Sequence, residues 1–213
     1  TCTGCSVSIL NSESPTIKNV LIDPVVPGKH INLRYHATVM AGAGEPVLEV
    51  IDEAQHHKKG GYILVVEGAI PTADNGRYGS LGEKNGALIP LAKRVEDMGR
   101  NALAVVALGT CAAFGGIAAA SPNPAQCRSV AQVFQSGGVA TPLVNIPGCP
   151  PHPDWFVGTV ASVLLLGLAA VASDLDELGR PKAFYSQLIH ENCPRRAYYD
   201  EKKFAKKLSD PGC

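Results

Sequence analysis

Three short runs of almost uniformly apolar, largely β-branched residues each end in a glycine-rich turn. The runs lie at residues 61–68, 103–109 and 143–148. A run in which polar and apolar residues do not alternate is typical of a strand buried on both faces, as in a parallel sheet. Helical patterns separate the runs, at residues 46–57, 86–99 and 129–135. This alternation predicts an α/β fold with an open, doubly wound parallel sheet.

Weaker patterns complete the expected organisation. Residues 19–22 and 31–33 favour one or two further strands, and residues 199–208 favour a helix. The longest apolar stretch, 156–172, is interrupted by glycine and hydroxyl side chains. It falls short of the roughly 20 apolar residues that a membrane-spanning helix needs, so we interpret it as a buried helix.

The composition and the charge balance exclude two broad classes of protein. Of the 213 residues, 46 % are hydrophobic and 18 % are charged, which allows a substantial core and excludes a largely disordered chain. Nineteen basic residues balance nineteen acidic ones. We therefore expect no nucleic acid partner, because such binding needs a basic surface that neutralises phosphates.

The chain changes character after residue 173. Residues 173–180 are acidic and turn-like, whereas residues 195–207 are strongly basic. We place a domain boundary near residues 175–182. The basic side chains could steer an acidic partner, although a solvated helix face is the simpler interpretation. They are Arg195, Arg196, Lys202, Lys203, Lys206 and Lys207.

Four of the seven cysteines occupy positions that a doubly wound sheet would bring together. Cys2 and Cys5 form a C-x-x-C pair, Cys111 follows the second apolar run, and Cys149 follows the third. The carboxyl ends of parallel strands converge on one crevice. Cys111 and Cys149 are therefore expected to meet. If the loop of the C-x-x-C pair lies at the same edge, four thiolates face one point.

Four thiolates at one point suit zinc or an iron–sulfur cluster. Structural zinc usually takes two local C-x-x-C pairs, but only one pair here is local. Glycines flank the cysteines, which lets the main chain pack close to sulfur and direct N–H groups at it. We prefer a [4Fe–4S] cluster. Zinc, and a disulfide or free thiols, are the alternatives.

The remaining cysteines differ in their surroundings. His190 and Cys193 form an H-x-x-C turn that can supply two metal ligands, and Cys213 is a candidate third ligand. Cys127 lies in a polar loop and has no partner at ligand spacing. We interpret Cys127 as a structural thiol.

Together these motifs resemble the small subunit of [NiFe] hydrogenases, and most closely that of the [NiFeSe] branch. The resemblance runs across most of the chain, and its last two motifs in combination are very specific. The motifs are Cys2-Thr-Gly-Cys-Ser6, Val66-Glu-Gly-Ala-Ile-Pro-Thr72, Gly109-Thr-Cys-Ala-Ala-Phe-Gly-Gly116, Asn145-Ile-Pro-Gly-Cys-Pro-Pro-His-Pro-Asp-Trp155 and His190-Glu-Asn-Cys-Pro194.

The resemblance implies two domains and three clusters. Residues 1–178 would form a flavodoxin-like domain, and residues 179–213 would begin a mostly irregular and helical iron–sulfur domain that is incomplete here. A proximal [4Fe–4S] cluster would be held by Cys2, Cys5, Cys111 and Cys149. A distal [4Fe–4S] cluster would be held by His190, Cys193, Cys213 and one later cysteine. A medial [3Fe–4S] or [4Fe–4S] cluster would take all its ligands from further along the chain.

The function that the resemblance implies is electron transfer within a heterodimeric hydrogenase. Hydrogen is split at a Ni–Fe centre in the large subunit, so this chain carries no catalytic residue. It would relay electrons to a redox partner such as a c-type cytochrome, in the periplasm. Any membrane association would not run through this segment.

Three further residues lie near the expected site. Glu67 is either a plain strand-end carboxylate or a group that hydrogen-bonds backbone near the cluster or takes part in proton traffic. His152 and Trp155 follow Cys149 in a proline-rich loop. We expect these two side chains to shape the loop and an interface, not to bind metal.

Two other functions compete with this one. The related iron–sulfur subunit of a quinone oxidoreductase complex has a similar fold, but it usually carries adjacent cysteines at its first site. A zinc-stabilised interaction module would use the same thiols without redox chemistry.

Overall fold

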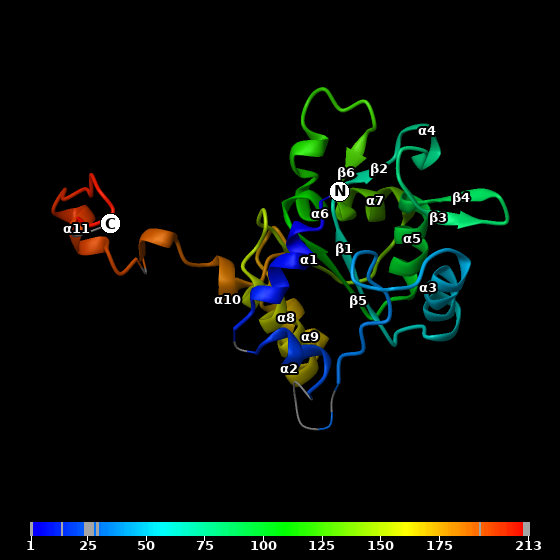
Figure 1. Cartoon of the computed structure of the whole chain (residues 1–213), viewed down its shortest axis with the longest axis horizontal. Coiled ribbons are helices and arrows are strands. Elements are labelled where there is room, and N and C mark those ends of the chain that lie inside the picture. Colours follow the sequence, from blue (N-terminus) through cyan, green and yellow to red (C-terminus); the bar gives the residue numbers. More distant parts are fainter. Residues whose placement is uncertain (1, 14, 24–27, 29, 192, 211–213) are drawn as a thin grey trace.

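A parallel sheet forms the centre of the protein. The computed structural model describes residues 2–13, 15–23, 28, 30–191 and 193–210. Within these residues the central sheet has three strands, in the spatial order β1-β5-β7. They are β1 (Ile63–Glu67), β5 (Ala104–Leu108) and β7 (Leu143–Ile146). Both neighbouring pairs run parallel, so the three apolar runs form the sheet that their pattern predicts (Figure 1).

The middle strand, β5, is buried along its whole length because both faces of the sheet are covered. Its residues alternate between two cores. Val105 and Ala107 pack into the first core, whereas Val106 and Leu108 pack into the second. Burial on both faces explains why the strand shows no polar alternation. The doubly wound α/β arrangement is therefore confirmed.

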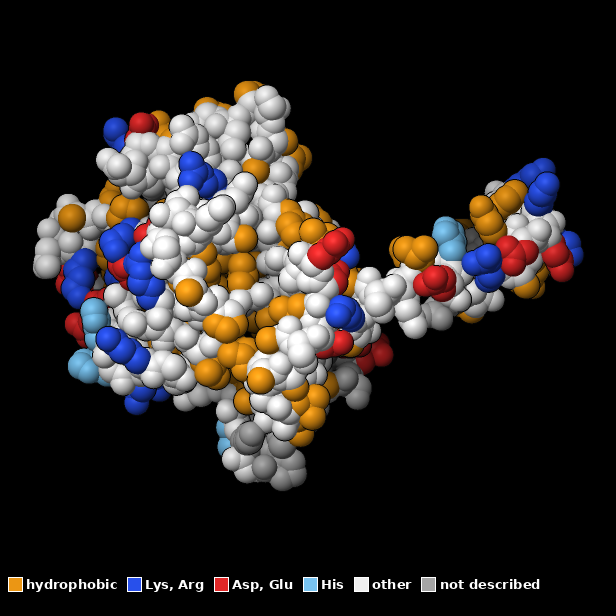
Figure 2. All heavy atoms as spheres, turned by 180° about the vertical axis from the view of Figure 1, so that it is seen from behind, with side chains coloured by type: hydrophobic (Ala, Val, Ile, Leu, Met, Phe, Trp, Pro, Cys, Tyr) orange, Lys and Arg blue, Asp and Glu red, His pale blue; other side chains and the backbone are white. Residues whose placement is uncertain are grey.

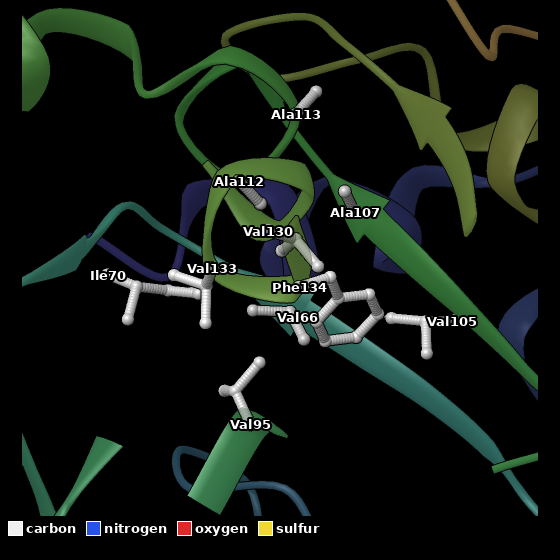
Figure 3. Close-up of a cluster of buried hydrophobic side chains, with 10 residues drawn as sticks. All are labelled: Val66, Ile70, Val95, Val105, Ala107, Ala112, Ala113, Val130, Val133 and Phe134. Atoms are coloured by element: carbon white, nitrogen blue, oxygen red, sulfur yellow. The ribbon is translucent and has the colours of Figure 1, made fainter. Parts of the chain in front are cut away.

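The first core lies between the sheet and three helices. These are α5 (Leu91–Asn101), α6 (Thr110–Phe114) and α7 (Val130–Gly137). Figure 3 shows its side chains converging, with Phe134 of α7 beside Val66 and Val105 of the sheet. Two short antiparallel strands, β2 (Ile70–Pro71) and β6 (Cys127–Arg128), border this core. Ile70 is fully buried in it.

The second core covers the opposite face of the sheet. It involves α1 (Gly4–Ser8), the 3₁₀ helix η1 (Ile9–Asn11), α8 (Pro153–Leu166) and α9 (Leu168–Ser173). The single buried helix expected at 156–172 is therefore wrong in two respects, since the stretch is divided and its residues Leu165 and Leu166 are exposed. Gly167 has a φ of 86° and divides the stretch into two helices. Among the described residues, none of the helices combines the length and apolar character needed to span a bilayer.

A third, smaller core lies under α3 (Glu45–His57), whose Leu48 and Ile51 are buried. It packs on a hairpin of β3 (Ser80–Lys84) and β4 (Ala87–Pro90). The helix expected at 86–99 is thus wrong over its first turn, and α5 begins only at Leu91. Asn85 and Gly86 both have positive φ. Asn-Gly is a strong hairpin signal, and it outweighed the helical pattern that follows.

The weaker strand predictions are wrong. The expected strand at 19–22 is instead helix α2 (Ile17–Leu21), because Thr16 and Asn19 form a capping box that satisfies first-turn N–H groups. Residues 31–33 belong to no strand or helix. Two further short elements, α4 (Ala73–Gly76) and the 3₁₀ helix η2 (Gly116–Ala119), flank the first core.

The C-terminal residues leave the main body of the protein after α10 (Lys182–Tyr185) (Figure 1). They contain the 3₁₀ helix η3 (Ile189–Glu191) and α11 (Arg196–Asp200). Figure 2 shows basic and acidic side chains mixed along this projecting segment. The helix expected at 199–208 is wrong, since α11 ends at Asp200 and turns follow. The division into domains at residue 178 stays a prediction.

The second core yields a stability prediction. Ile146→Ala should lower the free energy of unfolding by about 2–5 kcal/mol, because the Ile146 side chain is fully buried and its loss leaves a cavity. Ile117→Ala is the matched control, since Ile117 is 89 % exposed and the same truncation should cost less than about 0.5 kcal/mol. Urea unfolding measures both values. Similar losses in the two variants would contradict the placement of β7 in the core.

Candidate metal centre at the carboxyl edge of the sheet

The loops that follow β5 and β7 are tied to each other by hydrogen bonds. The Gly109 amide donates to the Ile146 carbonyl at 2.8 Å, and the Thr110 amide donates to the Gly148 carbonyl at 2.9 Å. The Thr110 hydroxyl accepts from the Gly148 amide at 3.0 Å. Cys111 therefore lies in the first turn of α6, beside the loop that carries Cys149. The expected meeting of these two loops is confirmed.

The N-terminal helix α1 is fixed at the same edge by the end of β1. The Glu67 carboxylate accepts from the Cys5 amide at 2.9 Å and from the Ser6 amide at 3.2 Å. It also accepts from the Ser6 hydroxyl. A carboxylate at this position satisfies N–H groups that have no partner within the helix. Glu67 therefore does hydrogen-bond backbone of the C-x-x-C motif.

Cys5 is the buried member of the group of thiols. Burial raises the pKa of the Cys5 thiol from 9.0 to about 12, with further contributions from the nearby Glu67 carboxylate and from Cys2 and Cys149. These charge effects place the Glu67, Cys2 and Cys149 side chains within electrostatic range of the Cys5 thiol. Without a cation, the Cys5 thiol stays protonated at neutral pH. A bound metal would reverse this, because it stabilises thiolate directly.

Glycine backbone makes room for two of the sulfur atoms and contacts a third. A Cβ on Gly109 would overlap the Cys5 sulfur, and a Cβ on Gly116 would lie 2.6 Å from the Cys111 sulfur. A Cβ on Gly4 would lie 3.5 Å from the Cys2 sulfur. The sulfurs thus rest against bare main chain. Soft thiolate donors in a glycine-lined site fit an iron–sulfur cluster.

The four thiols differ in exposure. Cys5 is buried and Cys111 is half-buried, whereas Cys2 and Cys149 are exposed. The site is therefore enclosed by the sheet edge on one side and open on the other. Within the described residues, no three His, Cys, Asp or Glu side chains converge closely enough to bind one metal ion.

The second predicted group of ligands lies in the projecting segment. His190 is exposed in η3, and its ring stacks on Tyr199 with centroids 5.5 Å apart. Arg196 fixes the turn, since its guanidinium donates to the His190 carbonyl at 3.1 Å and its amide donates to the Cys193 carbonyl at 3.0 Å. Cys193 is half-buried. Cys213 lies outside the described residues.

The other singled-out residues have structural contacts. The backbone of Cys127 is bracketed by the Asn123 side chain, which accepts from its amide and donates to its carbonyl. His152 Nδ1 accepts from the Asp154 amide at the start of α8. Trp155 packs edge-to-face on Tyr185, with centroids 4.8 Å apart. These contacts agree with loop-shaping roles for His152 and Trp155.

Sequence reasoning missed two residues that hold the site. Thr110 joins the two cysteine loops, and Tyr185 donates from its hydroxyl to the Pro147 carbonyl at 2.8 Å. Each partner lies 38 residues away in the sequence. No local pattern signals such a contact, although the position of Thr110 directly before Cys111 is a hint.

Comparison with known proteins identifies close relatives. The family described as NADH ubiquinone oxidoreductase, 20 Kd subunit, matches residues 2–163. The periplasmic [NiFeSe] hydrogenase small subunit of Desulfomicrobium baculatum is 43 % identical over all of this chain and 68 % of its own length. The periplasmic [NiFe] hydrogenase small subunit of Solidesulfovibrio fructosivorans is 40 % identical over 96 % of this chain.

A solved structure agrees with these sequence matches. The recombinant [NiFeSe] hydrogenase from Desulfovibrio vulgaris Hildenborough matches with a TM-score of 0.88 and 43 % identity, over 98 % of this chain and 75 % of its own. The chain spans 68 % of the length of the D. baculatum relative and 58 % of that of the S. fructosivorans relative.

The glycine lining yields a prediction that separates backbone strain from steric overlap. Gly109 and Gly167 have nearly the same backbone conformation, with φ and ψ of 87° and 159° and of 86° and 162°. Each substitution by Ala should cost about 1–3 kcal/mol in strain. Gly109→Ala should cost about 1 kcal/mol or more in addition, since its Cβ meets the Cys5 sulfur whereas that of Gly167 meets nothing. Denaturant unfolding of the metal-free protein tests this, and equal costs would refute the close packing of Cys5 on Gly109.

Proposed function

The chain belongs to the NADH ubiquinone oxidoreductase 20 Kd subunit family, and within it to the small subunits of [NiFe] and [NiFeSe] hydrogenases; from this premise we propose that it is the electron-transfer subunit of such an enzyme. It would relay electrons between a Ni–Fe site in a large subunit and an external acceptor. The overall reaction is H₂ = 2 H⁺ + 2 e⁻. None of its own residues takes part in splitting hydrogen.

The observation that carries the proposal is the setting of Cys5. Cys5 is buried against Gly109, its amide is held by the Glu67 carboxylate, and burial raises the pKa of its thiol, so the thiol becomes a good ligand only beside a large positive charge. Cys5 differs from an ordinary core thiol in having the Glu67 carboxylate and the Cys2 and Cys149 thiols within electrostatic range. A site that binds iron through several thiolates needs such a group of thiols.

The proposed proximal site uses Cys2, Cys5, Cys111 and Cys149. A [4Fe–4S] cluster bound there would accept and release one electron at a time. The chain's own residues supply the rigidity: Glu67 fixes the amide of Cys5, and Thr110 fixes the loop of Cys149. Rigid ligands keep the reorganisation that accompanies electron transfer small. Burial of Cys5 limits the access of water to one side of the site.

The proposed distal site uses His190 and Cys193 together with Cys213 and a later cysteine. A neutral imidazole in place of a thiolate leaves the ligand set less negative, which raises the reduction potential. Arg196 holds both ligand backbones in one turn. The exposure of His190 suits a site that exchanges electrons with a docking redox protein, for which a c-type cytochrome is our proposed candidate.

The open side of the proximal site suits contact with a large subunit. Phe114 ends the helix that contains Cys111, Ile117 lies in η2 just after it, and the two are 44 % and 89 % exposed. Exposed apolar side chains of this size near a functional site are typical of a protein interface. The relatives named above are periplasmic, and we propose the same location for this protein.

Cysteine substitutions test the proposal. In the protein purified with its large subunit, Cys149→Ser should remove the iron of one four-iron cluster and uncouple hydrogen oxidation from reduction of an external acceptor. Cys127→Ser is the matched control and should do neither, because Cys127 lies in β6, its backbone is held by the Asn123 side chain, and it is not one of the proposed ligands. Iron analysis and acceptor-linked activity measure the two effects.

Three results would count against the proposal. Equal iron in wild type and Cys149→Ser would remove Cys149 from the ligand set. Stoichiometric zinc without iron would favour a zinc-stabilised interaction module. Co-purification with subunits of a quinone oxidoreductase, and no nickel, would favour the subunit after which the matched family is named.

A further inference from the structure

Residues 174–185 form a compact turn that folds back on the sheet. Leu175 and Pro181 make a β-bridge, and the Asp176 carboxylate closes the turn by accepting from the Leu178 and Arg180 amides at 2.9 and 2.8 Å. The Arg180 guanidinium also donates to Asp176 at 2.7 Å. This turn is therefore rigid by itself and can serve as a support for other elements.

The turn is fastened to β7, the strand that leads to Cys149. The main-chain N–H of Asn145 donates to the Gly179 carbonyl at 2.8 Å. Its side-chain Nδ2 donates to the Leu178 carbonyl, also at 2.8 Å. Asn145 is buried. Further along, the Phe184 ring packs on Gly158 of α8 so closely that a Cβ there would lie 2.8 Å from the ring.

Tyr185 extends this support to the cysteine loop itself. Its hydroxyl donates to the Pro147 carbonyl at 2.8 Å. Its ring is held edge-to-face by Trp155 and lies beneath the Arg180 guanidinium, 5.3 Å from the ring centroid. Burial raises the pKa of Tyr185, which Arg180 partly opposes, so the hydroxyl keeps its proton and remains a donor.

We propose that Tyr185 is a positioning residue for the proximal site, which it stabilises by fixing the Pro147 carbonyl two residues before Cys149. The intervening Gly148 has no side chain that could restrain the loop. Thr110 holds the Gly148 amide from the side of β5, and Tyr185 holds the preceding carbonyl from the side of α10. The loop is thus clamped from two directions.

This inference rests on the proposed function, because it concerns a cluster bound by Cys149. Groups beyond the direct ligands orient those ligands and tune the metal. Loss of the hydroxyl would let the loop relax and would move the Cys149 thiolate relative to the other three. We expect a changed electronic environment of the cluster and easier escape of iron.

The chain offers a matched control for the Tyr185 hydroxyl. Tyr62 is also half-buried, and its hydroxyl donates to the main-chain carbonyl of Met98 at 2.7 Å. That bond joins the start of β1 to α5, at the opposite end of the sheet from the cysteines. Tyr62→Phe and Tyr185→Phe therefore remove the same kind of bond, one far from the site and one beside it.

The experiment compares both variants with wild type as the complete protein purified with its large subunit. The readouts are the EPR spectrum and midpoint potential of the proximal cluster, and the rate of iron loss to a chelator without oxygen. Tyr185→Phe should shift the spectrum and the potential and speed iron loss about three- to tenfold, as expected for one lost hydrogen bond. Tyr62→Phe should leave all three unchanged.

The outcomes separate the inference from the function on which it rests. An iron-loaded wild type with Tyr185→Phe indistinguishable from it in spectrum, potential and iron loss would overturn the inference alone. Equal changes in Tyr62→Phe and Tyr185→Phe would also overturn it, because a general loss of stability would then suffice. A wild type without iron would overturn the proposed function and the inference together.

Discussion

Parallel pairing of β1, β5 and β7 is the constraint on which the rest of the structure depends. Because the strands run in one direction, the residues that follow each of them emerge at the same edge. The loops that carry Cys111 and Cys149 therefore meet, and Glu67 holds the helix of Cys5 at the same edge, although long stretches of sequence separate these residues. The two apolar cores that cover β5 hold this edge rigid.

This arrangement makes ionisation of the Cys5 thiol unfavourable. Bringing the C-x-x-C motif to the sheet edge places a buried thiol next to a carboxylate and two other thiols, which opposes its ionisation. The Glu67 carboxylate is nevertheless required at this position, because it accepts hydrogen bonds from the Cys5 and Ser6 amides in the first turn of α1. An iron–sulfur cluster would supply the missing positive charge, so folding and metal binding are expected to support each other.

The parts of the fold that could be predicted are those marked by a clear pattern over neighbouring residues. The apolar runs identified the sheet, and the placement of Cys111 and Cys149 after strands identified the meeting of their loops. The Asn85-Gly86 pair is itself a hairpin signal, but it was overlooked because a helical pattern overlaps it. The helix expected at 199–208 rested on propensity alone, and the described residues of the projecting segment pack against none of the three cores that could stabilise it. Contacts such as that of Tyr185 with Pro147 arise only from tertiary packing.

Anomalous diffraction at the iron absorption edge, from crystals of the protein with its large subunit, tests the central claim most directly. The account predicts a four-iron cluster bonded to the sulfurs of Cys2, Cys5, Cys111 and Cys149. An absence of iron among these sulfurs, or a single zinc ion in their midst, would contradict it.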